Sequence, residues 1–226
     1  MYFLYIFAIA ALLVCPGRTI NCRNNRCTRR GRQNVVCEYP DPNPASVCGT
    51  VHSTGLTEPE RNDIVYWMNY ARAWVAKGLE KRGNPGPQPA ASDMRLLLWD
   101  DELADIAQRW ANQCIFEYAP CVDVERFEVG QTVVKFPRES LTMREVVDLI
   151  HEAVREMDRN QVCRVTDIWK AYMYKILVWA KTYKVGCGKI IYKADQGAQY
   201  TNHTVVCLYG PSGNVYGKRV YEIIDD

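Results

Sequence analysis

The sequence predicts an α+β fold, in which amphipathic helices pack against a small antiparallel sheet. The chain has 226 residues, of which 48% are hydrophobic, and this is enough for one sizeable core. Apolar residues recur at steps of three and four in several segments, as on one face of a helix. Two segments typical of strands, 185–192 and 199–209, then follow near the end of the chain.

The chain opens with an apolar run, MYFLYIFAIAALLV, which is followed at once by polar, cysteine-bearing sequence. The run is shorter than the roughly 20 residues that a membrane-spanning helix needs. This pattern is typical of a secretory signal peptide that is cleaved near Gly17, so we expect residues 1–17 to be removed. The mature chain is then expected to be extracellular, without a membrane span, and able to form disulfides.

Residues 18–56 are expected to be an irregular, cysteine-rich extension, because they show little periodicity and depend on disulfides for order. Three arginines, Arg29, Arg30 and Arg32, lie between two of these cysteines. They form either a solvated basic loop or a contact for a receptor or a glycosaminoglycan. The formal net charge of +2 is too small to favour nucleic acid as a partner.

The main domain is expected to span residues 57–226 and to begin with a helix. Thr57 and Glu60 form a capping box, and apolar residues at helical spacing then continue to Gly78. Asp100 is placed to cap a second helix, whose apolar residues also repeat at three and four residue steps.

Two more helices and the strands are expected in the second half. Thr142 and Glu145 form another capping box, and Thr166 can cap a fourth helix that includes Trp169. The two strands that follow are expected to be joined by a turn around Asp195–Gly197.

The segments WAKT (179–182) with VGCG (185–188), and VCLYGPSGN (206–214), resemble the two signature regions of the CAP superfamily. This superfamily includes cysteine-rich secretory proteins, insect antigen 5 and plant pathogenesis-related proteins. The words GLEKRGNPGPQP (78–89) resemble antigen 5 of hymenopteran venom most closely. The resemblance covers nearly the whole mature chain and implies an α-β-α sandwich. It also implies a secreted, monomeric venom or salivary component and a potential allergen.

The resemblance also implies a disulfide pairing, which spacing alone could not choose among the 105 arrangements open to eight cysteines. The implied pairs are Cys22 with Cys37, Cys27 with Cys121, Cys48 with Cys114, and Cys187 with Cys207. Cys15 is expected to leave with the signal peptide. Cys163 is then left without a partner, and it is either a buried or dimer-forming cysteine or a reactive thiol.

Many CAP proteins carry two histidines and two acidic residues that can hold a divalent metal. The matching positions in this chain are Tyr118, Gln131, Ala153 and Met173. None of these side chains combines metal affinity with a titration near neutral pH, so we expect no metal, no cofactor and no enzymatic activity.

Besides the receptor or glycosaminoglycan contact of the arginine loop, a ligand carrier and a divergent hydrolase remain open as alternatives to an inert scaffold. The cleft at these four positions either packs shut or is apolar enough to carry a lipid or another small hydrophobic ligand. A divergent hydrolase would have to use His151, the histidine on the helix that borders the cleft. Asn202 begins a glycosylation sequon, Asn202-His203-Thr204, in a chain that is expected to be secreted.

Overall fold

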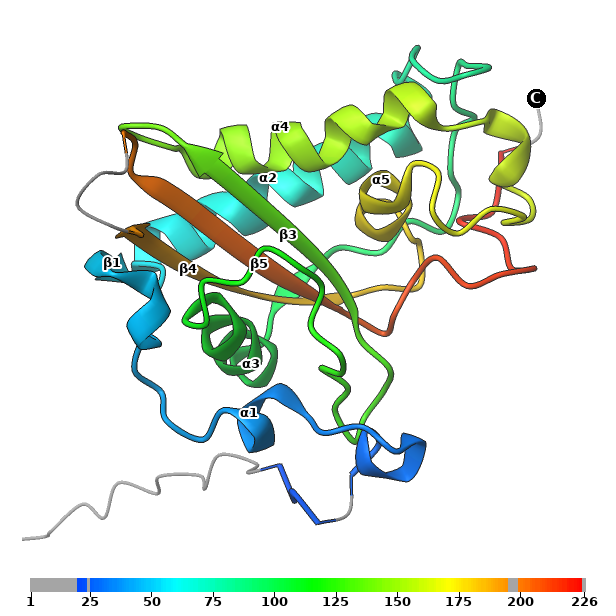
Figure 1. The fold of residues 1–226 in the computed structure, drawn as a ribbon. Helices are drawn as coiled ribbons and strands as arrows, with labels where there is room; N and C mark the ends of the chain where they lie inside the picture. The colour runs from blue at the N-terminus through cyan, green and yellow to red at the C-terminus, as the bar shows by residue number, and fades with distance from the viewer. Residues whose placement is uncertain (1–19, 24, 195–198, 225–226) are drawn as a thin grey trace, which may run out of the picture.

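A sheet of five described strands lies between two layers of helices (Figure 1). The computed structural model describes residues 20–224, except residue 24 and residues 195–198. The strand order is β1-β4-β5-β3 with antiparallel neighbours, and β2 pairs with β4 in parallel. The strands are β1 (Thr50–Thr54), β2 (Leu98–Trp99), β3 (Gly130–Pro137), β4 (Lys184–Lys193) and β5 (Asn202–Gly210). This architecture confirms the predicted α-β-α sandwich.

The helices divide between the two faces of the sheet (Figure 1). One face is covered by α2 (Glu58–Ala76), α4 (Met143–Glu152) and α5 (Tyr172–Leu177), and the other by α3 (Asp101–Ala111) with the short α1 (Val35–Glu38). Short 3-10 turns lie at Thr28–Arg30, Ser46–Cys48, Ala153–Glu156 and Arg159–Gln161. Within the described ranges, no helix has both the length and the apolar content that a membrane crossing requires.

The predicted caps of α2, α3 and α4 are present. Thr57 accepts a hydrogen bond from the backbone of Glu60, whose carboxylate accepts one from the Thr57 backbone at 2.8 Å. Thr142 and Glu145 form the same reciprocal pair at the start of α4. Asp100 accepts from a backbone N–H in the first turn of α3, at 3.2 Å. These caps satisfy donors that the first turn of a helix would otherwise leave unpaired.

Two hydrophobic clusters fill the spaces above and below the sheet. The larger one joins α2, through Ile64 and Met68, to α4, through Ile150, and to the facing side of the sheet. The other is centred on Leu103 and Ile106 of α3. The burial of these side chains explains why the helical periodicity predicted α2, α3 and α4 correctly.

Two glycines of β4 allow α3 to lie directly on the sheet. A Cβ atom at Gly186 would overlap the backbone of Ala104, and one at Gly188 would overlap the backbone of Gln108. Both contacted residues belong to α3. The signature words VGCG therefore specify how closely this helix approaches the sheet.

The prediction of a fourth helix capped by Thr166 is wrong, because α5 begins only at Tyr172. The Asp167 side chain accepts hydrogen bonds from the backbone N–H of Trp169, at 2.8 Å, and of the next residue, at 3.1 Å. Ala171 then adopts a left-handed conformation with φ of 53°. A side-chain turn of this kind competes with a helical turn, and Trp169 is left outside the helix.

The expectation of a wholly irregular extension at 18–56 is also wrong in part. Thr50–Thr54 forms the edge strand β1, which pairs with β4. The sequence did not predict β3 (Gly130–Pro137), the opposite edge of the sheet, which pairs with β5. The expected signal peptide, 1–17, and the expected turn, Asp195–Gly197, lie outside the described residues.

The disulfides of the described chain have the pairing that the resemblance implied. They join Cys22 to Cys37, Cys27 to Cys121, Cys48 to Cys114 and Cys187 to Cys207. Cys163 is free and exposed, so the hypothesis that it is buried is wrong. Cys15 lies outside the described residues.

Candidate functional site

Two of the four positions that correspond to the family's metal ligands line one cavity of about 490 Å³. The Tyr118 ring lies there against the Tyr172 ring, with their centroids 5.2 Å apart. The Gln131 amide also lines the cavity and is held at both ends by the backbone of Ala119. Its Oε1 accepts from the Ala119 N–H and its Nε2 donates to the Ala119 carbonyl, each at 2.9 Å.

The other two positions do not join this cavity. Met173 and Ala153 are partly buried and pack against the larger hydrophobic cluster. The donor set at the cavity, a phenol and an amide whose two ends are already bonded, does not fit a divalent metal. Among the described residues, no three histidine, cysteine, aspartate or glutamate side chains gather as a metal site would require.

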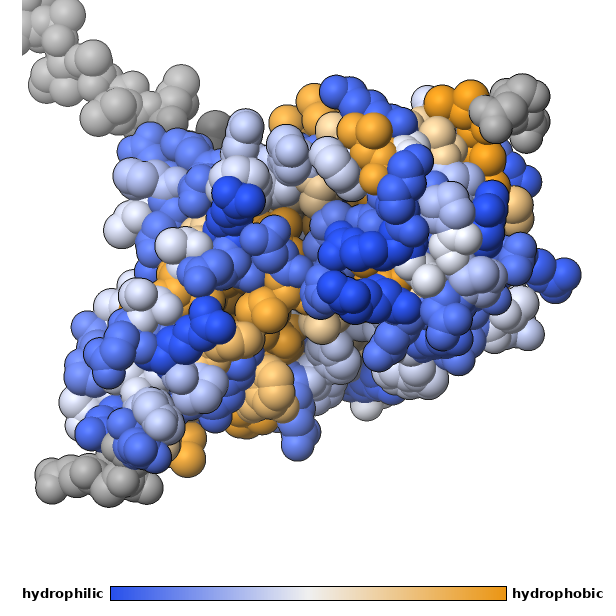
Figure 2. Space-filling model, turned by 90° about the horizontal axis from the view of Figure 1, so that it is seen from above, coloured by the Kyte–Doolittle hydropathy of each residue, from blue (hydrophilic) through white to orange (hydrophobic). Residues whose placement is uncertain are grey.

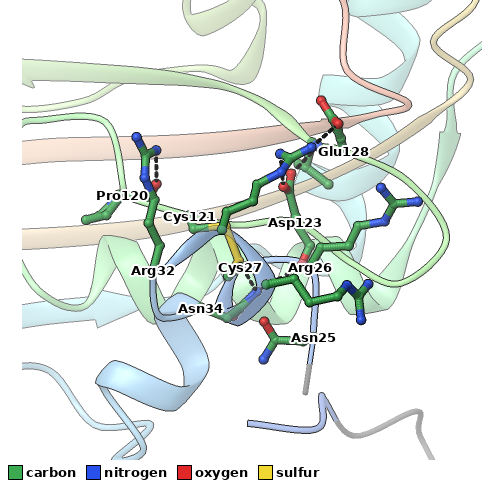
Figure 3. Close-up of polar contacts among 12 residues, drawn as sticks. Asn25, Arg26, Cys27, Arg32, Asn34, Pro120, Cys121, Asp123 and Glu128 are labelled. Atoms are coloured by element: carbon green, nitrogen blue, oxygen red, sulfur yellow. Dashed lines mark hydrogen bonds and ion pairs between the residues drawn. A yellow bond between two sulfur atoms is a disulfide. The ribbon is translucent and has the colours of Figure 1, made fainter. Parts of the chain in front are cut away.

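The cavity matches neither of the two alternatives left open for this cleft, because it is not packed shut and charged groups line part of it. Arg30 Nη1 lies 2.9 Å from Asp123 Oδ2, and the other end of the same guanidinium contacts Glu128 (Figure 3). Asp123 Oδ1 accepts from the backbone N–H of Val129 at 2.8 Å. Burial raises the pKa of Asp123, and its hydrogen bond and Arg30 oppose this shift.

The arginine loop is folded onto the segment that follows Tyr118. Arg29 pairs with Glu125 at 3.1 Å, and Arg32 Nη1 donates to the carbonyl of Pro120 at 3.0 Å. The Cys27–Cys121 disulfide anchors the loop in the same place (Figure 3). Carboxylates therefore already neutralise Arg29 and Arg30, and this arrangement does not favour the hypothesis of an anionic surface or receptor as a partner.

A second hollow, which the sequence did not predict, runs between α2 and α4 and has a volume of about 400 Å³. The rings of Trp67, Tyr70 and Trp74 line it in series, with centroids 5.6 Å and 6.3 Å apart. Leu79 and Val147 add aliphatic surface. Figure 2, which looks down on this layer of helices, shows apolar residues exposed between polar ones. We call this hollow the α2–α4 groove.

One end of the α2–α4 groove is a buried polar cluster. Glu80 accepts from Arg82 through two hydrogen bonds of 2.7 Å and 2.8 Å, and its Oε2 lies 3.0 Å from His151 Nε2. The His151 ring stacks on Tyr174 with centroids 5.7 Å apart. Burial lowers the pKa of His151, although the Glu80 charge opposes this shift. Burial alone would raise the pKa of Glu80. The hydrogen bonds and the charge of Arg82 have the larger combined effect, so the pKa of Glu80 lies below its usual value.

The remaining predicted site residue, Asn202, is the first residue of β5 and is partly buried. It pairs across the sheet with Pro137 and Tyr192, where β3 and β4 meet their loops. The sequon thus begins at the end of a strand. His203, its second residue, is buried in the sheet.

The sequence signal for the α2–α4 groove was present, but it was used only to predict a helix. Trp67 and Trp74 share the helical spacing of buried Ile64 and Met68, and periodicity alone does not say which partner covers an apolar face. The exposed fractions show that these side chains are not covered by the rest of the described chain, since Trp74 is 37% exposed and Tyr70 is 50% exposed.

Comparison with known proteins agrees with this architecture. The model of the CAP, or cysteine-rich secretory protein, family matches residues 65–209. Venom allergen 3 of Solenopsis invicta is 40% identical over 209 residues, which cover 89% of this chain and 88% of that relative. Venom allergen 5 of Vespula vidua is 38% identical over 198 residues, which cover 85% of this chain and 94% of that relative.

Two solved structures have the same fold. The structure of BmVAL-1 superposes with a TM-score of 0.63 at 28% identity, covering 75% of this chain and 85% of that one. The crystal structure of NaASP2 with Zn²⁺ gives a TM-score of 0.63 at 25% identity, covering 76% of this chain and 89% of that one. With the family match, the fold and the disulfide pairing in agreement, the chain belongs to the CAP family and is similar to the venom allergens 3 and 5.

Proposed function

We propose that the chain is a secreted, non-enzymatic CAP protein that carries a small amphipathic ligand, such as a lipid, in the α2–α4 groove. The observation that carries this proposal is the row of partly exposed aromatic rings along the groove. Tyr70, Trp74 and Leu79 are 50%, 37% and 41% exposed, respectively. A contiguous apolar hollow on the surface of a soluble protein is where a ligand or a partner binds.

The size and rim of the groove fit an amphipathic molecule with a polar head. Its volume of about 400 Å³ is within the roughly 300–1,000 Å³ that small-molecule sites occupy. Charged side chains line the groove beside the aromatic rings, and Arg82 and Arg144 are paired there with Glu80 and Asp148. The Arg144 guanidinium lies 4.6 Å from the centre of the Trp67 ring, so a cation and an apolar face are presented together.

The chemistry of the lining residues supports a carrier over a hydrolase. His151 Nε2 lies 3.0 Å from a Glu80 oxygen but makes no hydrogen bond among the described residues. The residues that line the groove also include no serine, threonine or cysteine that could serve as a nucleophile. At the cavity beside Tyr118, the two matched positions hold a phenol and an amide, Tyr118 and Gln131, and neither relays a proton at neutral pH. If a hydrolase activity is nevertheless measured, its loss in His151→Ala would assign it to this pair.

Titration with a fluorescent fatty acid tests the proposal. The wild-type chain is expected to bind about one probe molecule, and Trp74→Ala is expected to weaken binding at least tenfold because it removes one wall of the groove. Trp169→Ala serves as the matched control, since Trp169 is also an exposed tryptophan but lies away from the groove. Equal binding by wild type and Trp74→Ala, or no saturable binding at all, contradicts the proposal.

A further inference from the structure

We propose that the cavity beside Tyr118 is a second binding site and that it takes a neutral saccharide. One wall of this cavity is a row of aromatic rings, formed by Tyr118, Tyr172 and Trp169. Trp169 is 71% exposed and Tyr118 is 42% exposed, although both border a cavity of about 490 Å³. Large aromatic side chains left uncovered beside a cavity form a contact surface for a ligand.

The rings form an open platform and not a slot. Trp169 stacks on Tyr172 at 6.3 Å with an interplanar angle of 30°, and Tyr118 meets Tyr172 at 5.2 Å and 52°. Among the described residues Trp169 has one aromatic neighbour, Tyr172, and it is 71% exposed, so a ligand can pack on the open face of the indole without a second ring to enclose it. A pyranose ring needs only one such platform, because its C–H groups pack on an aromatic face while its hydroxyls point outward. The arrangement therefore favours a sugar over a nucleobase.

The platform is held in place before any ligand binds. The Asp167 side chain accepts from the backbone N–H of Trp169 at 2.8 Å, which fixes the turn that carries the indole. Gln131, bonded at both ends to Ala119, holds the segment that carries Tyr118. A preorganised surface loses less conformational entropy on binding.

The opposite wall is polar and balanced in charge. Its carboxylates are Asp123 and Glu128, and its guanidinium groups belong to Arg30 and Arg32. Arg30 is already shared by the two carboxylates, and Arg32 is bonded to a backbone carbonyl. This balance favours neither an anion nor a cation. Carboxylate and guanidinium groups carry paired acceptors and paired donors, which suit the adjacent hydroxyls of a sugar.

Asn214 supplies a further acceptor beside the platform. This residue lines the cavity and is 8% exposed. Its Nδ2 donates to the carbonyl of Ile168, whereas its Oδ1 has no hydrogen-bond partner among the described residues. A buried acceptor without a donor is costly, and a hydroxyl of a bound sugar would supply the missing donor.

This site is independent of the proposed carrier function. The α2–α4 groove is lined by residues of α2, α4 and the loop after α2, whereas the cavity is lined by residues 118–131, 168–172 and 212–214 and the arginine loop. Loss of one kind of binding therefore leaves the other intact.

Saturation-transfer NMR and calorimetry with neutral trisaccharides of glucose, mannose and N-acetylglucosamine test the inference, with adenosine as a comparison ligand. We expect saturable binding of at least one trisaccharide, weakened tenfold or more in Trp169→Ala. Trp74→Ala should bind the sugar as wild type does while losing the fatty acid. Because Trp169 is mostly exposed, its replacement should leave the circular dichroism spectrum unchanged.

Salt dependence gives a second readout, because binding of a neutral sugar should not change with ionic strength. Sugar binding that is unchanged in Trp169→Ala overturns the inference, as does the absence of saturable binding for all the trisaccharides. Binding of adenosine but of no sugar, or affinity only for a sulfated sugar that fades with added salt, overturns the assigned ligand class.

Discussion

The Arg72 side chain offers the sharpest test of how the fold is held together. Arg72 lies on α2 and is 1% exposed, and the structure gives its guanidinium no carboxylate partner within hydrogen-bond distance. It donates instead to five backbone carbonyls, at distances of 2.6 Å to 3.3 Å. These acceptors are the carbonyls of Arg95, Leu177, Trp179, Ala180 and Thr182. One side chain thus joins α2 to the segment that leads from α5 into β4.

Replacing Arg72 with methionine keeps much of its volume but removes a charged donor from five carbonyls, of which those of Trp179 and Ala180 keep a backbone N–H donor. Hydrogen bonds from a charged donor stabilise the folded chain by roughly 1.5–3 kcal/mol each. Removing the charge from water destabilises the folded chain by several kcal/mol and offsets part of this gain. Burial also lowers the pKa of Arg72 to about 9, so the side chain is still charged at neutral pH. The net loss of unfolding free energy is expected to be about 3–5 kcal/mol. Arg72→Lys, whose ammonium has only three donors, should lose about 2–4 kcal/mol.

Guanidinium chloride unfolding followed by tryptophan fluorescence, with the disulfides intact, measures these losses. Arg61→Met, on an exposed part of the same helix, is the matched control and should change the free energy of unfolding by less than about 1 kcal/mol. If Arg72→Met is as stable as Arg61→Met, the hydrogen bonds from Arg72 to the five carbonyls do not stabilise the fold as described. If Arg72→Lys is as stable as wild type, the planar fork of the guanidinium is not needed.

Three further predictions follow from buried groups and from the free thiol. Burial lowers the pKa of His151 and of His203, so the unfolded chain binds more protons and stability falls as the pH drops below 6.5. The double variant with glutamine at both positions should lose this slope, and an unchanged slope would show that other groups cause it. Gly188→Ala should lower the unfolding free energy by about 3 kcal/mol in the same denaturation assay, because the added Cβ would overlap the backbone of Gln108 on α3. An unchanged unfolding free energy would mean that α3 can move away from the sheet. Cys163 should react with a thiol reagent in the folded chain at one group per molecule, and labelling of Cys163→Ser would identify a different thiol.

The sequence predicted the elements that local chemistry specifies. The capping boxes at Thr57 and Thr142 and the cap at Asp100 mark α2, α4 and α3 correctly, because a cap and the first turn lie within four residues of each other. The helix expected after Thr166 failed because the Asp167 side chain closes a competing turn there. The edge strand β1 was hidden in a segment whose cysteines and prolines suggested irregular structure.

The candidate site depended on contacts that are distant in the sequence. The matched positions Tyr118 and Gln131 do meet at a cavity, but its charged wall comes from Arg30 and from Asp123, 93 residues further along the chain. No spacing rule links two such segments, and for this reason neither alternative for the cleft, packed shut or apolar, included the charged wall. The apolar surface lies instead between α2 and α4, where periodicity placed Trp74 on the apolar face of a helix without showing what would cover it.

Mass spectrometry of an organic extract tests the central claim most directly. The chain is purified under native conditions from the medium into which it is secreted, and the lipid recovered per mole of protein is measured for wild type and for Trp74→Ala. If the α2–α4 groove carries an amphipathic ligand, the wild-type extract contains about one lipid per chain and the Trp74→Ala extract contains far less. An extract of the wild-type protein without lipid in comparable molar amount contradicts the account.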